Sequence, residues 1–203
     1  MPEPGLTPGQ RVAKRVFDLA AAGFGLLAWA WLLALLWLIG TVHYRRNGFF
    51  TQVRIGRLGR PFRILKLRTM RPSDGRATTV TTAEDPRVDA WGAFLRRSKL
   101  DELPQLWNVL VGDMSLIGPR PDVRGFADRL RGQDRIVLSV RPGITGPATI
   151  RFRDEEGLLA AQAHPERFNR EVLFPEKTRL NRRYVEEYRF RRDLHYLWRT
   201  LRG

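Results

Sequence analysis

The sequence predicts a small α/β domain of the α+β kind, with a short β-hairpin and several helices, carried by one N-terminal membrane helix. Three observations predict this class: an uncharged apolar run over residues 19–40, two short β-like runs around a turn, and helical spacing of apolar residues further along. The 203 residues suffice for one medium domain plus an appendage. We therefore expect an N-terminal segment over 1–43 and a domain over 44–203.

The apolar run contains 22 consecutive residues without a charge. As a helix rising 1.5 Å per residue it would extend about 33 Å, close to the thickness of a bilayer's hydrocarbon core. A retained membrane helix over about 16–42 is the main interpretation, and a buried helix of a soluble core is the alternative. A cleaved signal peptide is not expected, because residues 41–46 do not resemble a cleavage site.

Basic residues lie on both sides of the run, whereas a simple span carries them mainly on its cytoplasmic side. A re-entrant helix, which enters the membrane and returns to the same face, would place both flanks on one side. No proline interrupts the run, and only Gly23 and Gly25 offer an easy bend. The sequence therefore leaves the re-entrant and spanning arrangements open. The flanking basic residues are Arg11, Lys14, Arg15, Arg45 and Arg46.

Residues 45–76 contain ten basic residues and one acid. Within them, residues 49–55 and 62–68 have strand-like composition, and residues 56–61 supply a turn. Such a charge run is either a solvated face or, after a membrane helix, a surface for anionic lipid and phosphate ligands. Residues 72–86 are polar and predict a mobile loop.

Helical spacing begins at Val88 and is clearest over residues 103–110, a helix that Gly112 is expected to end. Residues 114–121 and 141–147 are rich in Gly and Pro and are expected to be irregular. Residues 190–201 form a basic amphipathic helix, which either lies in a membrane interface or packs on the domain's own core.

Composition limits the chemistry. The chain has 36 Lys and Arg residues against 21 Asp and Glu residues, a formal net charge of +15, which predicts a polyanionic partner. The absence of cysteine excludes disulfides, thiolate metal sites and cysteine nucleophiles, and three histidines argue against a His-rich metal cluster. The P-loop, the dinucleotide fingerprint and the nucleophile elbow are missing too.

The sharpest motif is the carboxylate pair Asp101-Glu102, followed by Pro104. One interpretation is structural, because Asp caps helix N-termini well and Pro is tolerated in the first turn. The other is chemical: a carboxylate there can attack phosphorus, its neighbour can hold a divalent cation, and nearby arginines can neutralise developing charge. The arginines considered for that role are Arg96, Arg97, Arg120 and Arg141.

Four stretches together resemble the bacterial sugar transferases that are monotopic phosphoglycosyl transferases. The resemblance covers nearly the whole chain, and its long central block is highly specific. It implies a small α/β domain on the inner leaflet, held by a re-entrant helix and interfacial amphipathic helices. The stretches are KRVFD (14–18), FFTQVRIGRLGRPFRILKLRTM (49–70), DPRVDAWGAFLRRSKLDELPQLWNVLVGDMSLIGPRP (85–121) and RPGITGPATI (141–150).

The resemblance implies transfer of a phosphosugar from a UDP-sugar to a polyprenol phosphate, with release of UMP, through a covalent phosphosugar on Asp101. Glu102 would be the magnesium ligand. The resemblance implies a bacterial inner membrane location with the domain on the cytoplasmic face, membrane lipids as partners and no nucleic acid. A homodimer fits a small membrane enzyme, although no residue pattern argues for it. The implied substrate-binding residues are Lys66, Arg68, Arg96, Arg120, Pro121, Arg141 and Asp193.

The chain departs from the family pattern in its membrane helix. Members usually carry a Ser-Pro break near the middle, where Ala30 and Trp31 stand here. Without that proline, the clearest cause of a kink is missing, and the re-entrant topology rests on the basic flanks. Two competing hypotheses remain: a non-catalytic membrane scaffold that binds anionic lipid or nucleic acid, and a family member that has lost turnover. The intact carboxylate pair argues against the second.

Overall fold

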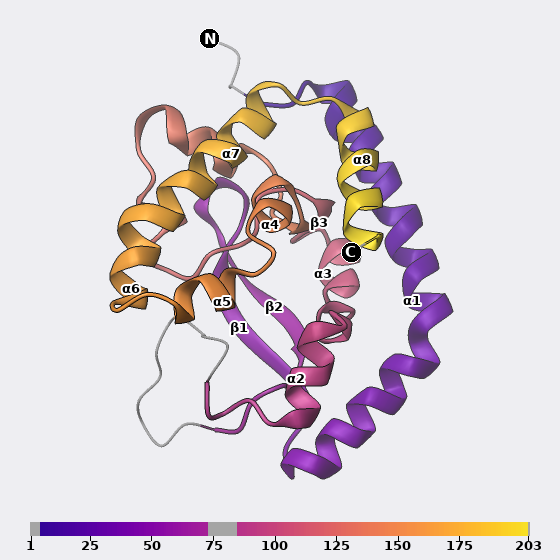
Figure 1. Cartoon of the computed structure of the whole chain (residues 1–203). Helices are drawn as coiled ribbons and strands as arrows, with labels where there is room; N and C mark the ends of the chain where they lie inside the picture. The colour runs from indigo at the N-terminus through magenta and orange to yellow at the C-terminus, as the bar shows by residue number, and fades with distance from the viewer. Residues whose placement is uncertain (1–4, 73–84, 203) are drawn as a thin grey trace.

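The computed structural model describes residues 5–72 and 85–202 (Figure 1). A mixed domain of helices and two small sheets lies beside one long N-terminal helix, as the predicted fold class requires. The loop expected over 72–86 falls almost entirely outside the described residues.

The long helix α1 (Pro8–Tyr44) begins about eight residues before the expected membrane helix. Its start is well defined, because the Thr7 hydroxyl accepts from the Gln10 backbone, the Gln10 side chain accepts from the Thr7 backbone, and Pro8 occupies the first turn. Its 37 residues continue as one helix through Ala30 and Trp31. Arg45 ends it in the left-handed conformation.

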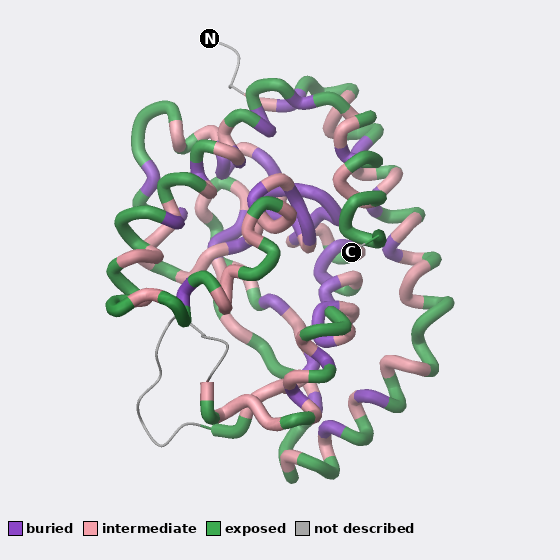
Figure 2. Tube along the Cα trace, viewed as in Figure 1, coloured by how far each residue is buried: buried purple, intermediate pink, exposed green. Residues whose placement is uncertain are grey.

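The two ends of α1 pack against the domain, and its middle does not (Figure 2). Ala22 and Leu36 are buried, whereas Leu27 is 82% and Trp31 is 65% exposed. The most apolar 18-residue window has a mean hydropathy of 2.1 and is only 11% buried. A helix of a soluble core would be mostly buried, so that alternative is wrong for the middle of α1.

The predicted hairpin is present. Strand β1 (Phe49–Ile55) pairs antiparallel with β2 (Pro61–Leu67), with Phe49 opposite Leu67. The second strand begins and ends one residue earlier than expected. A short 3-10 turn, η1 (Arg57–Gly59), connects the strands.

Next along the chain are α2 (Ala90–Arg97), the 3-10 turn η2 (Leu100–Glu102) and α3 (Gln105–Val111), which Gly112 ends with φ of +94° as predicted. The two segments expected to be irregular each contain a short strand. These strands, β3 (Ser115–Ile117) and β4 (Gly143–Thr145), pair in parallel. Glycine permits the pairing, because a Cβ on Gly143 would lie 2.1 Å from the Gly118 nitrogen.

The rest of the chain is mainly helical. Helix α8 packs Leu197 and Tyr196 on the main core, whereas Leu194 is 43% and Trp198 is 49% exposed. The core-packing interpretation of the tail therefore holds for the side of α8 with Tyr196 and Leu197. The interfacial interpretation stays a prediction for the side with Leu194 and Trp198. The elements are η3 (Ala127–Arg129), η4 (Gly132–Ser139), α4 (Pro147–Arg151), α5 (Glu155–Ala160), α6 (Pro165–Phe168), η5 (Asn169–Leu173), α7 (Phe174–Glu186) and α8 (Phe190–Leu201).

Candidate active site

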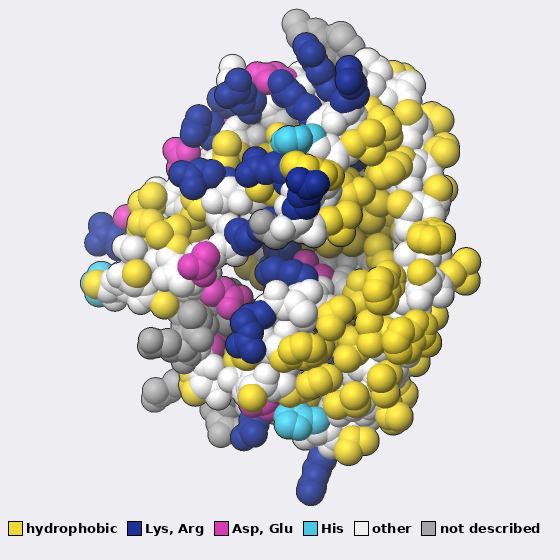
Figure 3. Space-filling model, turned by 45° about the vertical axis from the view of Figure 1, so that its right-hand side comes forward, with side chains coloured by type: hydrophobic (Ala, Val, Ile, Leu, Met, Phe, Trp, Pro, Cys, Tyr) yellow, Lys and Arg dark blue, Asp and Glu magenta, His cyan; other side chains and the backbone are white. Residues whose placement is uncertain are grey.

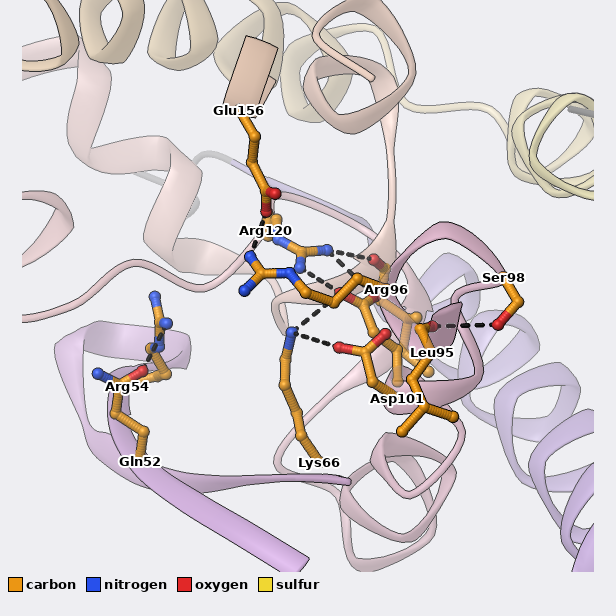
Figure 4. Close-up of polar contacts among 11 residues, drawn as sticks. Gln52, Arg54, Lys66, Leu95, Arg96, Ser98, Asp101, Arg120 and Glu156 are labelled. Atoms are coloured by element: carbon orange, nitrogen blue, oxygen red, sulfur yellow. Dashed lines mark hydrogen bonds and ion pairs between the residues drawn. The ribbon is translucent and has the colours of Figure 1, made fainter. Parts of the chain in front are cut away.

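The carboxylate pair lies in a cluster of charged side chains from three parts of the chain (Figure 4). Asp101 and Glu102 come from η2, Lys66 from β2, and Arg120 from the segment after β3. The left-handed conformation of Lys99, with φ of 58°, turns the chain between α2 and η2. Both carboxylates are buried, with 6% and 8% of their surface exposed.

Neither carboxylate caps a helix. The residue before α3 is Pro104, and no side chain caps that helix or η2. The structural interpretation of the pair as helix caps is therefore wrong. The physical reason is that η2 turns the carboxylates toward Lys66 and Arg120 rather than toward the free backbone N–H groups of α3.

Glu102 is held by both cations. Lys66 Nζ donates to its Oε1 at 3.0 Å, and Arg120 contacts both carboxylate oxygens, with Nη1 3.3 Å from Oε2. Burial opposes ionisation of Glu102, but the charges and hydrogen bonds of Arg120 and Lys66 outweigh it and hold the pKa of Glu102 well below its usual value. The same contact raises the pKa of Arg120, so this pair is charged throughout the physiological range.

Asp101 has a different environment although it is the next residue. Its Oδ2 lies 3.6 Å from Lys66 Nζ, beyond hydrogen-bonding distance, and its buried Oδ1 has no partner among the described residues. Burial raises the pKa of Asp101, and the charge of Lys66 opposes that shift. A buried carboxylate oxygen without a partner is costly, so this lone pair is available to a ligand.

The donor set suits magnesium. Mg²⁺ prefers oxygen ligands and is usually bound by one or two carboxylates together with substrate phosphates. Two adjacent buried carboxylates, Asp101 and Glu102 of η2, fit that pattern. Within the described ranges, no third acidic or histidine side chain completes a cluster, so phosphate and water oxygens would supply the other ligands.

Two further predicted residues lie at this site. The Arg96 guanidinium contacts Glu156 of α5, and Figure 4 places Arg96 beside Arg120. Pro121 is buried, and its carbonyl accepts from Arg54 Nη1 at 3.3 Å. Arg97, weighed as an alternative to Arg96, is exposed.

The structure does not bring Arg68, Arg141 or Asp193 to the carboxylate pair. Arg68 donates to the carbonyls of Asn47 and Phe49 at the open end of the hairpin. Arg141 donates to the Gly112 carbonyl at 2.7 Å. Their assignment to substrate binding stays a prediction.

Asp193 lies in a separate buried cluster. Lys14 Nζ is 2.5 Å from its Oδ2, and the Tyr184 and Tyr188 hydroxyls donate to it at 2.7 and 3.2 Å. This cluster joins α8 to the first turns of α1. A role for Asp193 in substrate binding also stays a prediction.

The sequence reasoning missed Gln52 and Arg54, two residues of β1 that Figure 4 shows across from Lys66. The alternation of side chains between the two faces of the strand could have identified them. Residues 50, 52 and 54 share one face of the hairpin with their β2 partners, and Lys66 is the partner of Phe50.

Comparison with known proteins places these observations in a family. The sequence model described as bacterial sugar transferase matches residues 9–203. The chain is 36% identical to the UDP-glucose:undecaprenyl-phosphate glucose-1-phosphate transferase of Caulobacter vibrioides, over 93% of this chain and 68% of that protein. It is 30% identical to the exopolysaccharide production protein ExoY of Sinorhizobium fredii, over 94% of this chain and 84% of that protein.

A third relative is longer than this chain. The galactosyl transferase CpsE of Streptococcus agalactiae is 31% identical over 94% of this chain, but the chain spans only 42% of its length.

Proposed function

Because the chain belongs to the bacterial sugar transferase family, we propose that it transfers a phosphosugar from a UDP-sugar to undecaprenyl phosphate and releases UMP. The donor class, a UDP-sugar, and the acceptor, undecaprenyl phosphate, are those in the name of the Caulobacter relative. The family model and that relative each cover more than nine-tenths of the chain, so the proposal concerns the region that holds Asp101 and Glu102.

The observation that carries the proposal is the contrast between the two adjacent carboxylates. Both oxygens of Glu102 are hydrogen-bonded to Lys66 or Arg120, whereas Asp101 keeps one buried oxygen that has no partner among the described residues. Environments that separate two neighbouring carboxylates assign them different roles. We assign Asp101 as the nucleophile and Glu102 as the charged group that orients the two cations.

The reaction then has two balanced steps. An oxygen of Asp101 attacks the phosphorus that carries the sugar, and the bond from this phosphorus to the bridging oxygen breaks, so that UMP leaves with that oxygen. An oxygen of undecaprenyl phosphate next attacks the same phosphorus, the bond to Asp101 breaks, and the carboxylate is regenerated. The lipid then carries a diphosphate-linked sugar.

Lys66 and Arg120 are placed to stabilise the charge of the transferred phosphoryl group, because both lie within 4 Å of the carboxylate pair. Glu102 would hold Mg²⁺, which when bound neutralises phosphate oxygens.

The membrane arrangement follows the same proposal, with the domain on the cytoplasmic face of the bacterial inner membrane. Both ends of α1 are tied to the domain: Lys14 near its start contacts Asp193, and Tyr44 at its end donates to Asp89 at 3.0 Å. The apolar middle is exposed. These contacts support a helix that enters the membrane and returns to the same face, and Figure 3 shows its hydrophobic surface beside the charged domain.

The non-catalytic scaffold is not favoured. It accounts for the net charge and the apolar helix, but it leaves Asp101 and Glu102 only the role of helix caps, which neither fills. Surface basic residues that attract anionic lipid are compatible with both functions, so the carboxylates decide between them.

A single-turnover experiment tests the proposal. The purified protein in lipid particles is mixed with magnesium and each of a panel of UDP-sugars, without acceptor. One sugar should release about one equivalent of UMP per enzyme and add the mass of its phosphosugar to the peptide that contains Asp101. UMP release that requires undecaprenyl phosphate and leaves no adduct would disprove the covalent step. No UMP from any donor, even with acceptor, would disprove the transferase.

A further inference from the structure

Gln52 and Arg54 lie on the same face of the hairpin as Lys66. Phe50 is opposite Lys66 in the register, and Gln52 and Arg54 follow at alternate positions. With a rise of about 3.3 Å per residue, Arg54 begins roughly 13 Å along the strand from the Lys66 pair. Figure 4 shows Arg54 apart from Lys66, so long side chains from these two positions can reach opposite sides of one ligand.

Only neutral groups hold the Arg54 guanidinium. Its Nη2 donates to Gln52 Oε1 at 2.6 Å and its Nη1 donates to the Pro121 carbonyl at 3.3 Å. Its Nε is buried and has no hydrogen-bond partner, and no carboxylate of the described chain lies within 4.0 Å of it. Arg54 is thus held in place, but no carboxylate of the described residues forms a direct ion pair with it.

A second cation makes this arrangement more costly. Burial and the nearby charge of Arg120 lower the pKa of Arg54 to about 10. The charges of Asp122, Glu102 and Glu155 oppose that lowering, but none of these carboxylates pairs directly with Arg54, and Arg120 already contacts Glu102. A bound anion would relieve both the missing hydrogen bond and the repulsion between the arginines.

We propose that Arg54, oriented by Gln52, binds the phosphate group of the departing UMP. The inference rests on the proposed function and identifies the second phosphate subsite of the same reaction. Guanidinium binds phosphate through parallel hydrogen bonds, and the free Nε edge of Arg54 is suited to that geometry. A sugar hydroxyl carries no charge and would leave the repulsion unrelieved. When the bond to the bridging oxygen breaks, the UMP phosphate gains negative charge, which Arg54 stabilises.

The cations around the carboxylates suit a ligand that has two charged groups. Lys66 and Arg120 lie next to the pair Asp101 and Glu102, whereas Arg54 lies near Pro121.

Binding of UMP and of uridine to the full-length protein tests the assignment without any turnover. The two ligands differ only by the phosphate, so their affinity ratio measures that group's contribution. Arg54→Gln should weaken UMP binding by about ten- to a hundredfold and leave uridine binding unchanged. Arg54→Lys and Gln52→Ala should give smaller losses of the same kind, since the first keeps the charge and the second keeps the guanidinium.

The matched control is Arg63→Gln, an exposed arginine on the opposite face of the same hairpin, which should leave both affinities unchanged. Thermal unfolding of each variant checks folding, and Gln52→Ala and Arg54→Lys carry the test if Arg54→Gln does not fold. An unchanged UMP-to-uridine ratio in folded Arg54 variants would overturn this inference alone. A wild-type protein that binds neither ligand would overturn the uridine-nucleotide donor and this inference together.

Discussion

Asp101 and Asp193 are both buried beside a lysine, yet their carboxylates are bonded very differently. Asp193 is fully buried and uses both oxygens, on Lys14 at 2.5 Å and on two tyrosine hydroxyls. Asp101 lies 3.6 Å from Lys66 and leaves Oδ1 without a partner. Burial and a neighbouring lysine therefore do not identify a reactive carboxylate. We propose that the unpartnered oxygen does, because a carboxylate with both oxygens hydrogen-bonded to protein groups mainly stabilises the fold.

The largest expected effect is on turnover at Asp101. Asp101→Asn keeps the shape of the side chain but removes the nucleophile, so UMP release should fall on the order of 10⁴-fold or more. The free energy of unfolding should change little, because the carboxylate has no close partner to lose. Initial rates of UMP release and denaturant unfolding measure the two quantities. A strongly destabilised variant would place Asp101 in the same class as Asp193.

The second effect is on stability at Asp193. Asp193→Asn leaves Lys14 buried without a counterion and should lower the free energy of unfolding by about 3–5 kcal/mol, measured by denaturant unfolding. Asp134→Asn is the matched control, since Asp134 pairs with Arg182 at 3.0 Å in an exposed position and should cost less than about 1 kcal/mol. Equal losses in the two variants would remove the structural distinction drawn for Asp193.

A smaller effect is expected at Arg120. Arg120→Lys keeps the positive charge but cannot contact both oxygens of Glu102 at once. UMP release should fall about ten- to a hundredfold. The variant should stay folded, which thermal unfolding checks. Wild-type turnover in Arg120→Lys would show that a positive charge is sufficient at this position and that the planar guanidinium is not required.

The smallest effect concerns a third aspartate, Asp122. Burial raises its pKa to about 6, and Arg54, Arg120 and Lys177 oppose that shift while Glu155 adds to it. Because the folded protein binds this proton more tightly than the unfolded chain, ionisation of Asp122 costs stability as pH rises from about 4 through 6. Asp122→Asn should therefore raise the free energy of unfolding by about 1 kcal/mol at pH 8. This is less than the whole pKa shift would give, because the side chain is partly exposed to water.

That gain should be absent at pH 4, where the wild-type carboxyl is also neutral. Unfolding curves of both proteins at the two pH values measure it. A gain of the same size at pH 4 would show that ionisation of Asp122 is not the cause.

Local patterns predicted part of the fold. The hairpin was predicted to within one residue, the end of α3 at Gly112 was predicted correctly, and the apolar run identified α1. The early start of α1 was not predicted, because its first turns are basic and pack on α8 through Lys14. The parallel pairing of β3 with β4 was also missed, since Gly- and Pro-rich segments carry no strand pattern and the contact depends on backbone approach.

Three of the residues that the family resemblance implied for the site lie together, and their roles stay predictions. Lys66 and Arg120 contact Glu102, and Figure 4 shows Arg96 beside Arg120. Arg54 was not predicted, because the feature that singles it out is a missing hydrogen-bond partner. An unpaired Nε beside a second guanidinium is visible only after the chain has folded.

The ion pair between Lys14 and Asp193 also has a consequence for the order of events during synthesis. The two residues are 179 positions apart, and at about 5–20 residues per second the ribosome needs roughly 10 to 35 s to travel between them. Throughout that interval, α1 can enter the bilayer while Lys14 still lacks its counterion. Helix α8 therefore completes the base of a helix that was made long before it, and a nascent chain stopped before α8 would leave Lys14 without Asp193.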